Sequence, residues 1–266
     1  MGCPYFYPYR AAKRHGHRDV SSYKKEKLIL AGIFLGILPM LTIQFGLLLA
    51  FFLWKRQYTI VITSLITIFC IEGLSILALG LSKNIGYFMA ISGIISSETK
   101  PVAFNYASLN LSLNAFFYRL LLPFCTITFV QATALLASGS LIMLTAVLTK
   151  TKHTISDPRF SLEFSLILVL LCIISPIVHI THYVYLLIPI VLFWNNLNIF
   201  ENSKAPWILF IISFLLISVQ YSFNSFTLFH KGILSVFYSG QLYGSLLLFV
   251  IGISSSATCF KIPLNL

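Results

Sequence analysis

The chain has 266 residues, of which 58% are hydrophobic and only 9% are charged, and its mean hydropathy is +0.91. Soluble domains are about half apolar and about a quarter charged, so this composition excludes water as the main solvent of the protein. The formal net charge of +11 would suggest nucleic acid in a soluble protein, but here most basic residues lie in short segments between apolar runs. That pattern is typical of membrane orientation, so we expect lipid as a partner and no nucleic acid.

Residues 1–27 are rich in Lys and Arg and have no apolar core, so we predict a basic cytoplasmic arm rather than a signal peptide. Residues 28–266 then form one membrane domain. The five cysteines are scattered, and neither their spacing nor any His pattern predicts a metal site. We therefore expect reduced structural thiols and no metal or other cofactor.

Apolar runs that can cross a bilayer as helices recur along the membrane domain. A spanning helix needs about 20 residues, and in lipid the backbone must satisfy its own hydrogen bonds. We therefore predict an all-α, polytopic integral membrane protein with about six transmembrane helices. The runs are Tyr58–Leu81, Leu120–Thr149, Phe160–Ser175, Tyr183–Ile199, Ala205–Ser222 and Leu234–Ile253.

The segment Leu28–Trp54 permits two interpretations, because Pro39, Gln44 and Gly46 interrupt it. It is either one tilted span or a re-entrant helical hairpin. The hairpin gives the stronger positive-inside bias and is preferred. It puts both termini in the cytoplasm. Of the 18 Lys and Arg residues, it leaves only Lys83, Lys100, Arg119 and Lys231 on the outer side.

On this topology a long loop, Ser82–Tyr118, and a tight turn, Pro176–His182, face the extracytoplasmic side. Loops carry function more often than the elements they connect. In the turn, His179 and His182 are three residues apart and share a face if the turn is helical. The alternative is a solvated interfacial turn with its histidines among the lipid headgroups.

The long loop contains a polar stretch in which Asn110 and Asn114 precede Arg119 at the outer end of a predicted span. Asn side chains both donate and accept, which suits sugar hydroxyls, and the guanidinium of Arg suits phosphate. The alternative is an ordinary polar loop with an arginine that extends to the interface.

Glu72 lies well inside the run Tyr58–Leu81. An acid at that depth in a membrane is rare, which makes Glu72 a candidate functional residue. The alternative is a structural carboxyl group that forms hydrogen bonds within the membrane.

Three motifs in this order resemble family 87 of the polyprenyl-phosphate-dependent glycosyltransferases, which have the membrane-embedded GT-C type of fold. The resemblance covers roughly residues 30–191. The motifs are the hairpin from Ala31-Gly32 to Lys55-Arg56, the stretch from Asn110 to Arg119, and Ser175-Pro176 through His182-Tyr183 to Pro189.

The resemblance implies transfer of a hexose or pentose from a polyprenyl-phosphate donor to an extracytoplasmic acceptor, with inversion, in the cytoplasmic (inner) membrane of a bacterium. Arg119, His179 and His182 would bind the donor phosphate, and Asn110 and Asn114 would lie near the sugar. The family's catalytic Asp belongs to a loop ahead of the matched motifs, and Glu98 is the acid that the predicted outer loops offer here. The chain then corresponds to the C-terminal portion of such an enzyme, and a second chain could supply the rest.

Two other function classes fit the same sequence. One is a non-catalytic membrane partner that binds polyprenyl lipid or another subunit. The other is a transporter or flippase in which Glu72 is a proton-coupled site.

Overall fold

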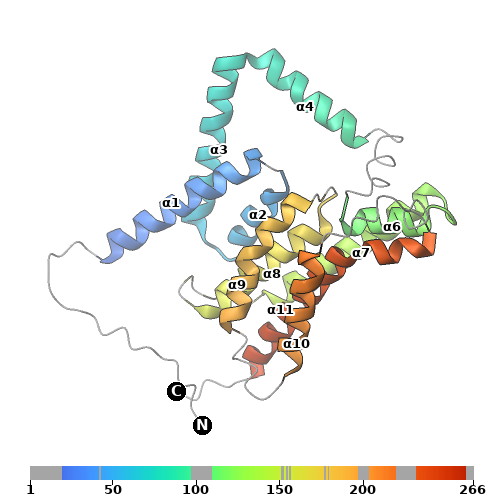
Figure 1. Cartoon of the computed structure of the whole chain (residues 1–266). Coiled ribbons are helices and arrows are strands. Elements are labelled where there is room, and N and C mark those ends of the chain that lie inside the picture. Colours follow the sequence, from blue (N-terminus) through green and yellow to red (C-terminus); the bar gives the residue numbers. More distant parts are fainter. Residues whose placement is uncertain are drawn as a thin grey trace, which may run out of the picture.

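The structure is a computed structural model that describes residues 20–41, 43–96, 110–150, 153, 155, 157–176, 178, 180–196, 204–219 and 232–261. Every regular element in these residues is helical, which confirms the predicted all-α class. In chain order (Figure 1) they are α1 Val20–Leu41, η1 Ile43–Phe45, α2 Gly46–Trp54, α3 Tyr58–Leu79, α4 Leu81–Ser96, α6 Leu113–Leu121, α7 Ile127–Leu148, α8 Pro158–Ile174, η2 Ile180–Leu186, α9 Leu187–Asn196, α10 Ala205–Ser218, η6 Gly232–Tyr238 and α11 Gly240–Lys261.

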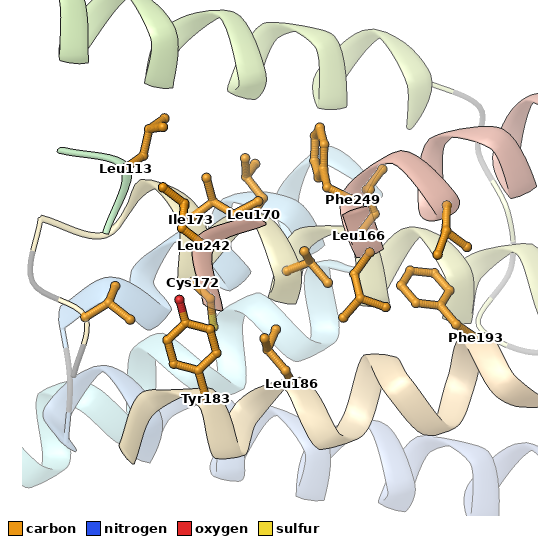
Figure 2. Packing of buried hydrophobic residues seen from close by; sticks show 14 of the residues in the cluster. Leu113, Leu166, Leu170, Cys172, Ile173, Tyr183, Leu186, Phe193, Leu242 and Phe249 are labelled. Carbon is orange, nitrogen blue, oxygen red and sulfur yellow. The ribbon is translucent and has the colours of Figure 1, made fainter. Parts of the chain in front are cut away.

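Helix α8 is the centre of the packing. Residues 165–173 are all buried, as expected of a helix that is apolar on every side. Figure 2 shows Leu166, Leu170 and Ile173 of α8 among side chains from α6, η2, α9 and α11. The opposite face of α8 packs against Phe45, Phe51 and other apolar residues of η1 and α2.

Helix α2 runs antiparallel to α8 and contacts both of its ends. Gln44, just before α2, accepts a hydrogen bond from Ser175 at the C-terminal end of α8. Lys55, just after α2, forms an ion pair with Glu163 near the N-terminal end of α8. We call these the Ser175 end and the Glu163 end of the protein.

Helix α1 lies parallel to α3 through the motif Gly32-x-x-x-Gly36. A Cβ at Gly32 would lie 2.7 Å from Thr63 Cβ, and a Cβ at Gly36 would lie 2.7 Å from Thr67 Cβ. Only glycine permits so close an approach of two helices, so the motif serves packing. α1 continues through Pro39 to Leu41, and η1 and α2 follow it in the chain.

Local sequence explains where several helices begin. The side chains of Ser112, Thr126 and Asp157 accept hydrogen bonds from the backbone N–H groups of Ala115, Phe129 and Arg159, and so cap α6, α7 and α8. Pro158 follows the Asp157 cap, in the first turn, where a missing N–H costs nothing.

Two of the described helices, α3 and α7, are long and apolar enough to cross a membrane. In the most apolar 18-residue stretch of α3 only 17% of the residues are buried inside the protein, and in that of α7 only 11%. Their apolar side chains therefore face outward, unlike those of α8.

The structure differs from the predicted elements in the expected loop Ser82–Tyr118. This range contains most of α4 and the beginning of α6, and α4 follows α3 directly after Gly80, whose φ of 85° suits glycine. The expected span Leu120–Thr149 begins as the end of α6, turns near Pro123, and continues as α7. The sequence did not predict α4 because its apolar run begins only after Lys83 and Asn84 and is shorter than the roughly 20 residues that a span needs.

Candidate functional site

The side chain of Asn110 joins the two polar motifs, which are 66 residues apart in sequence. Its Oδ1 accepts hydrogen bonds from the backbone N–H groups of Ser112 (3.2 Å) and Val178 (3.0 Å), and its Nδ2 donates to the carbonyl of Pro176 (3.0 Å). The backbone N–H of Leu111 also donates to the carbonyl of Val178 at 2.8 Å. Asn110 is 1% exposed, so it holds the turn from inside the protein.

These contacts satisfy backbone groups that the Ser175-Pro176 turn frees. A proline cannot continue the hydrogen bonds of α8, and buried backbone groups need partners. The hydroxyl of Ser112 donates a further bond to the carbonyl of Pro176 at 3.3 Å. The turn is thus fixed mainly by the residues that precede and cap α6.

Arg119 lies in the last turn of α6 and is 1% exposed. Its Nη1 donates to the carbonyl of Asn110 at 2.6 Å, and its Nη2 lies 3.5 Å from the Ser239 hydroxyl. The guanidinium therefore lies on the inner side of residues 110–112, which we call the Asn110 segment. It is placed between α6 and the start of α11. The sequence suggested a ligand of the donor phosphate, or alternatively an arginine that extends to the interface, and in the structure the Arg119 side chain is buried.

The short helix η1, between α1 and α2, reaches the same turn. The Ser175 hydroxyl donates a hydrogen bond to Gln44 Oε1. The rings of Phe45 and Tyr185 pack edge to face, with their centroids 4.8 Å apart. Three segments that are far apart in sequence thus meet at the Ser175 end: η1, the Asn110 segment and the Ser175-Pro176 turn.

The other predicted residues have different environments. His182 is half-buried in η2, and the centroid of its ring lies 6.1 Å from that of Tyr185. Asn114 is half-buried in the first turn of α6. Glu72 is half-buried in α3. Glu98 and His179 lie outside the described residues. No group of three or more His, Cys, Asp or Glu among the described residues could hold a metal ion.

A second polar cluster, at the Glu163 end, was not predicted from the sequence. Lys55 Nζ lies 2.7 Å from Glu163 Oε2 and donates to the carbonyl of Thr149, at the C-terminal end of α7, at 2.6 Å. The Lys55 and Glu163 side chains are 1% and 3% exposed. The sequence signal for this cluster is an acid, Glu163, inside the mostly apolar run Phe160–Ser175.

His153 extends this cluster. Its Nδ1 lies 3.2 Å from Asp157 Oδ2, and its Nε2 lies 3.9 Å from Glu163 Oε1. The pKa of His153 is lowered from 6.5, mainly because the imidazole is partly buried. The nearby Asp157 carboxylate acts to raise this pKa, whereas the positive charges of Lys55 and Arg159 lower it further.

The lowered pKa makes stability depend on pH. Below pH 6.5 the unfolded chain binds a proton at His153 more readily than the folded chain, so the free energy of unfolding falls as the pH falls through this window. We expect thermal unfolding of the detergent-solubilised protein to show a smaller drop in stability between pH 7.5 and pH 5.5 for His153→Gln than for the wild type. An unchanged pH profile in His153→Gln would contradict this.

The described part of the chain thus combines an all-helical fold, two long outward-facing apolar helices and a polar site at the Ser175 end. Comparison of the chain with family models, curated proteins and solved structures finds no significant match. Its function has to be inferred from its own residues and their arrangement.

Proposed function

We propose that this chain is an integral membrane protein that binds a polyprenyl-phosphate sugar at the Ser175 end and belongs to a membrane glycosyltransferase, as the C-terminal portion of its catalytic unit. The reaction is transfer of a hexose or pentose to an extracytoplasmic acceptor with inversion. The observation that carries the proposal is the pair of hydrogen bonds in which Asn110 donates to the carbonyl of Pro176 and accepts from the backbone N–H of Val178, since they join motifs that are far apart in sequence.

The outward-facing apolar surfaces of α3 and α7 support a membrane location. About six spans and a re-entrant α1–α2 hairpin fit the succession of helices. The exposed Arg56 and Lys150 flank Lys55 and Thr149 at the Glu163 end, which favours a cytoplasmic location for that end. The Ser175 end then faces the extracytoplasmic side, where a polyprenyl-phosphate sugar would be used.

The chemistry assigns different tasks to the residues of the site. His182 and His179 bind the donor phosphate, and Asn114 lies near the sugar. Arg119 places a fixed positive charge beneath the turn, and in a site that excludes water such a charge stabilises the departing phosphate without direct contact. Asn110 holds the turn that carries the histidines.

A second candidate is a subunit that binds the donor lipid without turnover. Inverting transfer needs a carboxylate base for the acceptor hydroxyl. The acidic residues that the structure describes are Glu26, Glu72, Asp157 and Glu163. None of them takes part in the contacts described above for the Ser175 end. This observation favours a partner chain or another segment as the source of the base.

The test is donor binding by the full chain in liposomes, measured with radiolabelled polyprenyl-phosphate mannose and a polyprenyl-phosphate pentose. We expect saturable binding that His182→Ala weakens roughly tenfold, the effect of about one charge-assisted hydrogen bond. His153→Ala, a histidine change at the Glu163 end, should leave binding unchanged. Saturable binding supports a donor site in both candidates, and no binding of either donor contradicts the proposal.

A further inference from the structure

Helix α3 carries a continuous outward-facing stripe. Its positions alternate at spacings of four and three residues along the whole helix, which is the heptad spacing of helices that pack in pairs. We call it the α3 seam, and its members are Tyr58, Ile62, Leu65, Phe69, Glu72, Ile76 and Leu79. All six apolar members are exposed, from 38% for Ile76 to 73% for Phe69.

The main partner of α3 among the described helices, α1, lies on a different face. α1 approaches Ile60, Thr63, Ser64 and Thr67, and none of these belongs to the α3 seam. In Figure 1, α3 extends past α1 to α4, so its outer part stands away from the rest of the helices. The α3 seam is therefore an unoccupied surface of the described structure.

Glu72 gives the α3 seam a chemical preference. It is the one ionisable side chain in the stripe apart from Tyr58 at its start, and the structure shows no hydrogen bond or ion pair between Glu72 and any described residue. An acid at this depth in a bilayer is costly unless another group pairs with it. Beside it, a Cβ built at Gly73 would meet nothing within 4 Å, which leaves room for the backbone of a neighbouring helix.

We infer that the α3 seam docks one transmembrane helix of another protein, which has apolar residues at heptad spacing and a Lys or Arg opposite Glu72. Charge complementarity selects this occupant over a second copy of the chain, because parallel pairing of two α3 helices would bring two Glu72 carboxyl groups together. The length of the α3 seam, 22 residues, matches one bilayer crossing. The inference rests on the membrane location in the proposed function, but not on sugar transfer.

The test uses designed transmembrane peptides with Leu and Ile at heptad positions and either Lys or Leu at the central one. Association with the labelled full chain is measured by energy transfer in liposomes. We expect the Lys peptide to bind the wild type roughly tenfold more tightly than the Leu peptide, the scale of one interhelical polar contact. Glu72→Leu should reverse this preference, which a general loss of folding cannot do.

Two further variants separate the α3 seam from other exposed surfaces. Phe69→Ala in the α3 seam should weaken peptide binding severalfold, whereas Leu136→Ala, an equally exposed residue of α7, should not. Equal binding of the two peptides, or association between copies of the chain that Phe69→Ala abolishes, would overturn the inference. A chain that fails to insert into liposomes contradicts the membrane location itself, whereas an inserted chain that ignores both peptides contradicts only the docking of a helix.

Discussion

Replacing Lys55 with Met lowers the free energy of unfolding by about 3–5 kcal/mol, because Glu163 is left buried without its cation. The Lys55 and Glu163 side chains are almost fully buried, and Lys55 also satisfies the carbonyl of Thr149 at the end of α7. The change therefore weakens the junction of α2, α7 and α8 at once. Denaturant unfolding of the detergent-solubilised protein measures it.

Two variants show whether the ion pair itself is responsible. Arg56→Met removes the neighbouring exposed cation and should change stability by less than about 0.5 kcal/mol. The double variant Lys55→Met with Glu163→Leu removes both charges and should recover most of the loss, since apolar residues of similar size replace buried ion pairs well. A double variant as unstable as Lys55→Met would contradict this account of the junction.

Replacing Asn110 with Ala removes three hydrogen bonds and should cost about 2–4 kcal/mol. The backbone N–H groups of Ser112 and Val178 and the carbonyl of Pro176 are the groups that lose the Asn110 side chain as a partner. A buried polar group left unsatisfied costs about 1–3 kcal/mol, and the Ser112 hydroxyl still serves Pro176. Thermal unfolding and proteolysis near the Pro176 turn measure the effect.

Asn114 provides the matched control for this prediction. It is the same residue type, four residues further on, but it is half-buried, and the hydrogen bonds to Pro176 and Val178 described above belong to Asn110. Asn114→Ala should therefore cost less than Asn110→Ala and leave the turn resistant to protease. If both variants cost the same, the turn does not depend on the Asn110 side chain.

Sequence reasoning predicted the helical class because long apolar runs allow few other structures. It also predicted that the Asn110 stretch and the Pro176 turn share one end of the protein, since a charge bias fixes which loops lie together. The structure adds what periodicity cannot give, namely that Asn110 and Arg119 point inward and hold backbone groups.

Other features depend on contacts that no local pattern encodes. The pairing of Lys55 with Glu163 joins residues more than a hundred positions apart, and either residue alone looks like an ordinary interfacial charge. The heptad spacing of the α3 seam is visible in the sequence, but only the structure shows that α1 packs on another face. Helix α4 was missed because its apolar run is shorter than the roughly 20 residues that a span needs.

The most direct test of the proposed function is mapping of a bound donor. A polyprenyl-phosphate sugar with a photoreactive group near the phosphate is activated on the full chain in liposomes, and the labelled peptides are identified by mass spectrometry. The account predicts labels within residues 110–119 and 175–186, at the Ser175 end, that excess unlabelled donor prevents. Labels confined to the Glu163 end, or labels that unlabelled donor does not reduce, would contradict it.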